Sequence, residues 1–234
     1  MTSVIKELLE LVYPEKHVCF LCGYQDLSIH NEHLCASCQQ KMIKLEQPLC
    51  HICSKPLAEA IGVCRECVQM PKEFERAIAV YSYEGTIKQT ISDFKYHGKS
   101  YLYKIFSWQM VELLKKENLT DFDQIVPVPL HSYKEVKRGY NQSKLLARDI
   151  SSNLGMPMVE LVKRTKKTKP QNKLATYERW HNMTGAIDIK KSKKVGKKIL
   201  LVDDIYTTGA TMNACAKVLK REGASIVIGI SIAR

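Results

Sequence analysis

The chain has 234 residues and carries 36 lysines and arginines against 24 aspartates and glutamates, a formal net charge of +12 at pH 7. A chain of this length holds one sizeable domain and one small domain. No apolar run approaches the length that crosses a bilayer, which excludes a helical membrane span.

Residues 1–13 form a short apolar helix pattern that contains Lys6, Glu7 and Glu10. A secretory signal peptide has a basic leader and a small-residue cleavage site, and this segment has neither. We therefore expect a cytoplasmic protein. Thiols stay reduced there, so closely spaced cysteines favour metal binding over disulfides.

Eight of the nine cysteines fall in four C-x-x-C pairs, and the gaps between the pairs are 12, 11 and 10 residues. Two residues between cysteines let both thiolates face one ion, as in zinc knuckles. Four evenly spaced pairs therefore predict two zinc sites with four cysteines each. Sequential pairing gives Cys19, Cys22, Cys35 and Cys38 as one set, and Cys50, Cys53, Cys64 and Cys67 as the other. A cross-braced arrangement, first pair with third, stays open.

The cysteine-rich segment 19–67 has few apolar side chains, so we expect the metal to supply its folding energy. Four neighbouring histidines are alternative ligands, although the cysteine sets are already complete: His17, His30, His33 and His51. We predict a double zinc ribbon with its own core over residues 1–70. The boundary falls near Met70-Pro71-Lys72, and an α/β domain occupies residues 71–234.

From Ala77 onward strand patterns alternate with helix patterns, which predicts the α/β class with a mostly parallel sheet and flanking helices. The predicted strands are Ala77–Tyr83, Phe122–Val128, Met158–Val162, Lys197–Asp203 and Ser225–Ile232. The predicted helices are Ile87–Tyr96, Tyr101–Lys116, Gln142–Leu154 and Ala210–Glu222. The ninth cysteine, Cys215, falls inside the last helix, and we expect it to pack in the core.

Three short segments at predicted element ends are candidates for ligand contact. Residues 126–130 read VPVPL, a stiff turn at the end of a strand. Residues 138–142 place Arg138, a glycine and an asparagine before a helix, which suits either phosphate binding or simple helix capping. Residues 94–98 place Lys95 between aromatics, which suits either base stacking or a core helix.

Residues 163–198 are strongly basic, with 13 lysines and arginines against Glu178 and Asp188. The first cluster is Lys163, Arg164, Lys166, Lys167 and Lys169, and the second is Lys190, Lys191, Lys193, Lys194, Lys197 and Lys198. Such runs form either solvated loops or contacts with pyrophosphate or nucleic acid. Residues 165–176 lack periodicity, which predicts a mobile loop that can close over a pyrophosphate group.

Residues 199–211 read ILLVDDIYTTGAT and carry the most specific signal in the chain. Four apolar residues predict a short buried strand that ends at Asp203 and Asp204, and a hydroxyl-rich turn and a helix follow. Ligands of open α/β sheets bind at the carboxyl ends of strands, and a helix N-terminus offers N–H groups to phosphate. Carboxylates accept hydrogen bonds from vicinal sugar hydroxyls. The segment therefore predicts a site for ribose 5-phosphate, formed by Asp203, Asp204, Thr207, Thr208, Gly209, Ala210 and Thr211.

Three other interpretations of this segment fit less well. A P-loop ATPase requires G-x-x-x-x-G-K-[ST], which the chain lacks. The acidic pocket of a receiver domain needs most of a domain after it, whereas only 30 residues follow Asp204. A helix cap needs one residue rather than an acidic pair with three hydroxyls. The segment closely resembles the 5-phosphoribosyl-1-pyrophosphate motif of type I phosphoribosyltransferases.

Nearly the whole chain resembles the ComF-type phosphoribosyltransferase-like proteins. The matching elements are the four cysteine pairs, Phe94-Lys95-Tyr96, VPVPL at 126–130, RGYNQS at 138–143, Gln171, Arg179, Asn182, residues 199–211 and Ala233-Arg234. The resemblance implies a double zinc ribbon joined to a phosphoribosyltransferase fold. It also implies a bacterial cytosolic protein of natural transformation, which handles incoming single-stranded DNA with a helicase-like partner.

Two hypotheses follow. In the first, the chain is an enzyme that transfers 5-phosphoribose with Mg²⁺ to an unidentified acceptor. In the second, it is a DNA-uptake adaptor that keeps the ligand site as a sensor or a relic. The candidates for pyrophosphate or DNA contact are Lys95, Arg138, Lys166, Lys167, Lys169 and Arg179. No general base stands out beyond His131 and His181. Family relatives that move amino groups onto ribose carry a glutaminase domain, which this chain lacks.

Overall fold

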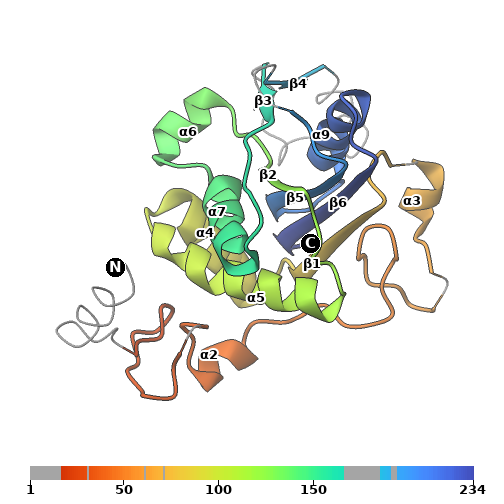
Figure 1. The fold of residues 1–234 in the computed structure, drawn as a ribbon. Coiled ribbons are helices and arrows are strands. Elements are labelled where there is room, and N and C mark those ends of the chain that lie inside the picture. The colour runs from red at the N-terminus through yellow and green to blue at the C-terminus, as the bar shows by residue number, and fades with distance from the viewer. Residues whose placement is uncertain (1–16, 31, 61, 71, 166–184, 191–193) are drawn as a thin grey trace.

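A computed structural model describes residues 17–30, 32–60, 62–70, 72–165, 185–190 and 194–234 (Figure 1). The helix pattern of residues 1–13 lies outside the described residues. So do several candidate residues, namely Lys166, Lys167, Lys169, Gln171, Arg179, His181 and Asn182. Within the part of the chain that is described, no helix has the length and apolar character needed to cross a membrane.

Four parallel strands form the central sheet in the order β1-β6-β5-β2. Their bounds are β1 Arg76–Tyr81, β2 Gln124–Pro127, β5 Lys198–Ile205 and β6 Ile226–Ala233. The two central strands, β5 and β6, are covered on both faces. That explains why residues 199–202 are apolar without alternation and fully buried. The predicted α/β class with a parallel sheet is confirmed.

Helices cover both faces of the sheet (Figure 1). Helices α4 Gly85–Tyr96, α5 Tyr103–Lys116 and α7 Gln142–Leu154 pack on the face that carries Leu200 and Val202. Helix α9 Ala210–Arg221 packs on the opposite face, against Ile199 and Leu201. Alternate residues of one strand thus serve two separate cores. Cys215 on α9 is fully buried, so its predicted packing role is confirmed.

The remaining elements are short. They are α2 Ala36–Gln40, α3 Arg65–Gln69, the 3₁₀ turn η1 Ser100–Leu102, α6 Ser132–Arg138, and the two-stranded antiparallel sheet of β3 Val162–Arg164 and β4 Ile187–Ile189. His131 is the N-cap of α6, and its Nδ1 accepts the Tyr133 N–H at 3.2 Å, while Gly139 is the C-cap.

The predicted strand Met158–Val162 is wrong in most of its length. The Ile125 N–H donates to the Pro157 carbonyl and the Val159 N–H donates to the Ile125 carbonyl, both at 2.9 Å. The next donor along this edge of β2 would be Pro127, which has no N–H. The segment therefore leaves the sheet edge after one bridge, and Val162 pairs with Ile189 instead.

The expectation that the cysteine segment has a core of its own is also wrong. Its first half packs Ile29, Leu34 and Met42 into the same hydrophobic cluster as the α4, α5 and α7 face of the sheet. Its second half joins the cluster on the α9 face. The backbone adds further links, since Leu45 N–H donates to Val80 at 3.0 Å and Ala77 N–H donates to Ile52 at 2.7 Å. The segment obtains its missing apolar contacts from the sheet and its helices.

Candidate functional site

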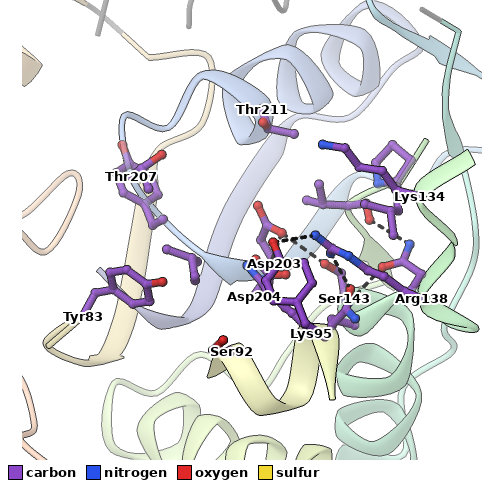
Figure 2. A pocket seen from close by; sticks show the side chains of 18 of the residues that line it. Tyr83, Ser92, Lys95, Lys134, Arg138, Ser143, Asp203, Asp204, Thr207 and Thr211 are labelled. Atoms are coloured by element: carbon purple, nitrogen blue, oxygen red, sulfur yellow. Dashed lines mark hydrogen bonds and ion pairs between the residues drawn. The ribbon is translucent and has the colours of Figure 1, made fainter. Parts of the chain in front are cut away.

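The acidic pair lies at the carboxyl end of β5, where α4 ends and α7 begins (Figure 2). The hydroxyl of Ser143 donates to Asp203 Oδ1 at 3.1 Å. The ammonium of Lys95 lies 2.9 Å from Asp204 Oδ1, and only 14% and 16% of these two side chains are exposed. The sequence prediction that residues 203–204 end a strand at the rim of the sheet is confirmed by this geometry.

The two carboxyl groups compete for ionisation. Burial, followed by the charge of Asp204, raises the pKa of Asp203 from 3.8 to about 7, although the Asp204 N–H, Lys95 and Ser143 favour its charged form. Asp203 therefore keeps its proton at a higher pH than an ordinary aspartate does. A ligand that donates hydroxyl hydrogens to both carboxylates would supply the hydrogen bonds that favour full ionisation.

A tight turn follows the acidic pair. Gly209 adopts φ +76° as the N-cap of α9, and a Cβ there would lie 2.3 Å from the Tyr206 hydroxyl. Glycine is therefore required for both backbone conformation and space. The turn leads into a 12-residue helix, whose first N–H groups have no helical acceptor, and Thr207, Gly209, Ala210 and Thr211 line the same cavity as the acidic pair. Such an arrangement is suited to a phosphate dianion.

One cavity of about 1420 Å³ contains both the acidic pair and this turn. Basic side chains line it from several elements: Lys88, Lys95, Lys134, Lys137, Arg138 and Arg164. In Figure 2, Thr207 lies to one side of Asp203 and Asp204, and Lys134 and Arg138 lie to the other. The cavity thus has Thr207 on one side of the carboxylates and the cations Lys134 and Arg138 on the other.

The cations lie close enough to affect one another. Burial, with Arg164, Arg138 and Lys95, lowers the pKa of Lys134. Arg138 donates to Gln142 at 3.0 Å and to the Tyr96 hydroxyl at 3.1 Å, and its guanidinium lies 4.8 Å from the Tyr96 ring centre. Gathered like charges of this kind raise the free energy of the ligand-free protein and favour a multiply charged anion.

The structure distinguishes between the interpretations of several candidate residues. Lys95, predicted at the pyrophosphate, forms an ion pair with Asp204. Asn141 caps α7, since its side chain accepts the Ser143 N–H at 3.0 Å, so the capping interpretation of residues 138–142 is confirmed. His131, a candidate base, caps α6. Phe94 belongs to the core, whereas Tyr96 is exposed.

Sequence reasoning missed Lys134, Ser143 and Tyr206. Lys134 lies on α6, a helix with no buried residue and therefore no apolar periodicity to reveal it. Ser143 belongs to the RGYNQS segment, which is one of the elements that carry the family resemblance. That membership could have marked Ser143 as a candidate site residue. Tyr206 lies inside the 199–211 motif but was not given a role, because its ring points into the core beneath the turn.

The cysteines form two groups of four: Cys19, Cys22, Cys35 and Cys38, and Cys50, Cys53, Cys64 and Cys67. Within each group the sulfur atoms lie within 4.8 Å of one another, and no disulfide links them. This grouping is the sequential one rather than the cross-braced one. Four thiolates at this separation suit tetrahedral zinc, so the two clusters are consistent with two zinc sites. We call them the first and second cysteine clusters.

The described histidines near these clusters make other contacts. His17 Nδ1 lies 2.6 Å from the Ile29 carbonyl, and the His33 ring stacks on Phe20 at 4.3 Å. Neither they nor His30 and His51 belong to a metal-binding group among the described residues.

Comparisons with known proteins agree with this two-part architecture. The double zinc ribbon domain family matches residues 8–68, and the phosphoribosyl transferase domain family matches residues 141–234. The chain is 29% identical over 226 residues to competence protein ComFC of Bacillus subtilis, covering 89% of this chain and 90% of that protein. It is 28% identical to competence protein F of Haemophilus influenzae, covering 85% and 89%. It is 29% identical to DNA utilization protein YhgH of Escherichia coli, covering 90% and 93%.

Proposed function

We propose that this chain, a member of the ComF family of competence proteins, binds 5-phosphoribosyl-1-pyrophosphate and single-stranded DNA in DNA uptake. The family combines a double zinc ribbon with a phosphoribosyltransferase domain. It acts in the cytoplasm beside a helicase-like partner, as the family resemblance implies. The observation that carries the ligand assignment is the single cavity in which the hydroxyl-rich turn, the acidic pair and the cations lie in that order.

Each part of the ligand has a matching part of the cavity. The 5′-phosphate binds at Thr207–Thr211, where N–H groups and hydroxyls donate. The two ribose hydroxyls donate to Asp203 and Asp204. The pyrophosphate lies toward Lys134 and Arg138, whose charges it neutralises.

Binding changes the partner of one lysine. Lys95 Nζ lies 2.9 Å from Asp204 Oδ1 and neutralises its charge. When ribose hydroxyls donate to that carboxylate, the ammonium is free to turn toward the pyrophosphate, which combines the sequence prediction for Lys95 with its position in the fold. Mg²⁺, whose preferred ligands are phosphate and carboxylate oxygens, would screen the charge of the pyrophosphate when bound.

The DNA part of the proposal rests on charge and on the relatives. Two relatives are named competence proteins and one a DNA utilization protein. Residues 163–198 contain 13 lysines and arginines, and charge of this kind attracts the phosphates of nucleic acid whatever the base sequence. Described residues of that segment enter the cavity only through Arg164.

A second candidate function, transfer of 5-phosphoribose to an acceptor, is favoured by one observation. Tyr83, Lys88, Gln89 and Ser92 also line the cavity. In Figure 2, Tyr83 lies below Thr207 and Ser92 lies below Asp204. None of the three proposed ligand parts needs these four residues, and an acceptor could contact them. Release of pyrophosphate on addition of DNA to protein, Mg²⁺ and 5-phosphoribosyl-1-pyrophosphate would support transfer, and binding without release would favour the adaptor.

The ligand proposal is tested with the double variant Asp203→Asn and Asp204→Asn, which keeps shape and removes two charged acceptors. Hydrogen bonds to charged groups contribute about 1.5–3 kcal/mol each, so affinity should fall roughly tenfold or much more. The control is Asp121→Asn, since Asp121 is almost fully exposed and, among the described residues, pairs only with Lys198. We expect 5-phosphoribosyl-1-pyrophosphate with Mg²⁺ to raise the unfolding temperature of wild type and control but not of the double variant. Equal shifts in all three would reject the assignment.

A further inference from the structure

A second cavity, of about 340 Å³, lies between the second cysteine cluster and the phosphate turn. Its walls include Cys53 and Cys67 on one side and Thr207 and Thr208 on the other, with Arg234 and Tyr206 also lining it. Thr207 lines the larger cavity as well, together with Gly209, Ala210 and Thr211 of the same turn. The second cysteine cluster therefore stands directly behind the residues that we assign to the 5′-phosphate.

Arg234 connects the two sides of this cavity. Its guanidinium donates to the Cys53 carbonyl at 2.6 Å and lies 5.0 Å from the centre of the Tyr206 ring. Only 10% of the side chain is exposed, and Glu66 lies 3.9 Å away. A buried cation held by a carbonyl and an aromatic face has few alternative positions. Movement of the Cys50–Cys53 turn would therefore move Arg234.

Tyr206 continues the connection into the turn. It is 4% exposed, its N–H donates to the Ala233 carbonyl at 2.9 Å, and its ring meets Phe74 edge-on at 6.3 Å. Its hydroxyl occupies the space that a side chain on Gly209 would need. Tyr206 thus supports the turn from below, and Arg234 holds Tyr206.

The first cysteine cluster has no such path among the described residues. It packs into the hydrophobic cluster of α4, α5 and α7, on the other face of the sheet from α9. The second cluster shares its hydrophobic cluster with Tyr206, Ala210 and Met212, all at the turn or the start of α9. The first cysteine cluster therefore serves as a control for the second, because both have four cysteines but only the second is connected to the phosphate turn.

We propose that Arg234 and Tyr206 are positioning residues through which the second cysteine cluster holds the phosphate turn, so that metal at this cluster and a ribose 5-phosphate ligand at the turn bind cooperatively. The inference rests on the proposed function, since it takes 5-phosphoribosyl-1-pyrophosphate as the ligand. The first cluster takes no part in this coupling.

The first experiment compares Arg234→Gln with Arg221→Gln, a control at the exposed end of α9. The readouts are the dissociation constant of 5-phosphoribosyl-1-pyrophosphate with Mg²⁺, and the zinc content of each purified protein. We expect Arg234→Gln to keep two zinc ions and to bind the ligand at least tenfold more weakly, Arg234→Lys to recover part of the loss, and Arg221→Gln to bind as wild type. Wild-type affinity in Arg234→Gln would overturn the proposal.

The second experiment uses unaltered protein and does not depend on a variant folding. Zinc is titrated away with a chelator at equilibrium, with and without ligand, and alkylation of the released thiols shows which cluster has lost its metal. Binding coupling is reciprocal. Ligand should therefore raise the zinc affinity of the second cluster by the same factor by which that metal raises ligand affinity, and leave the first cluster unchanged.

The possible outcomes distinguish failure of the proposed function from failure of the coupling between metal and ligand. If wild type does not bind the ligand at all, the proposed function and this inference both fail. If wild type binds the ligand but the zinc affinities of both clusters stay the same, the inference fails and the proposed function stands.

Discussion

The surroundings of Asp203 make ionisation of its carboxyl group unfavourable. It is partly buried beside a second carboxylate, and its pKa rises to about 7 as a result. Of its described neighbours, Ser143 and the Asp204 N–H donate to it, while Lys95 pairs with Asp204 instead. Strained ionisation of this kind concentrates at functional sites, because a ligand can supply the stabilisation that the free protein lacks.

The first prediction concerns pH. Because the folded pKa of Asp203 lies above its ordinary value of 3.8, the stability linked to this group is fully present below about pH 4 and is lost as pH rises through about 7. Asp203→Asn removes that loss. It should raise the free energy of unfolding of the ligand-free protein at pH 8 by about 1–3 kcal/mol, since each tenfold change in proton affinity is worth about 1.4 kcal/mol.

Denaturant unfolding at pH 5 and pH 8 measures this effect. The variant should gain stability over wild type at pH 8 much more than at pH 5, and should lose ligand affinity. The same difference between the two proteins at both pH values would show that Asp203 is ionised throughout.

Among the helices and strands, those that bury many apolar side chains were predicted most accurately from the sequence. The bounds of α7 match its predicted range, and β5 and β6 lie within a few residues of theirs, because each of these elements buries a regular apolar pattern. Helix α6 buries no residue and gave no signal, so its Lys134 was missed. The strand at Met158–Val162 was wrong because Pro127 on the neighbouring strand removes a donor, a long-range effect that the local pattern does not contain.

The acidic pair and the turn could be predicted because they are contiguous in sequence. The cations could be named but not placed, since Lys95, Arg138 and Arg164 come from three separate elements that only the fold brings together. The packing of the cysteine segment was equally hidden, because its apolar partners lie in the sheet. The boundary near residue 70 stays a prediction.

The second prediction concerns the two cysteine clusters as structural elements. Wild type should hold two zinc ions per chain, Cys35→Ser and Cys64→Ser one each, and His30→Ala, the control at an exposed neighbouring histidine, two. Because each cluster shares a hydrophobic cluster with one face of the sheet, each cysteine variant should lower the main unfolding temperature, by roughly 5–10 °C. Metal analysis and calorimetry give both quantities. An unchanged main transition after loss of one zinc ion would mean that the cysteine segment folds apart from the sheet.

At the scale of the whole molecule, the excess positive charge is unevenly placed. The formal net charge is +12, and residues 163–198 contain 13 of the 36 lysines and arginines. Zinc-bound thiolates of the two cysteine clusters would make the N-terminal part of the chain less positive. A protein with this distribution attracts polyanions toward one part of its surface.

The third prediction is that single-stranded DNA binds without strong sequence preference, with log K falling with log salt by about 0.7 for each phosphate contact. Changing Lys166, Lys167 and Lys169 to Glu should weaken binding and flatten this slope. The charge-matched control changes Lys41, Lys115 and Lys116, all exposed, to Glu. If the two triple variants lose affinity equally, only net charge matters. If the first binds as wild type, DNA binds elsewhere, and the zinc ribbon is the next surface to test.

Calorimetric titration of the unaltered protein measures directly whether one cavity binds a phosphate, a ribose and a pyrophosphate together. We predict that 5-phosphoribosyl-1-pyrophosphate with Mg²⁺ binds with one site per chain and at least tenfold more tightly than ribose 5-phosphate. The added pyrophosphate reaches the cations Lys134 and Arg138 beyond Asp203 and Asp204, which ribose 5-phosphate does not reach. Equal affinity for the two ligands, or no binding of either, would contradict the account.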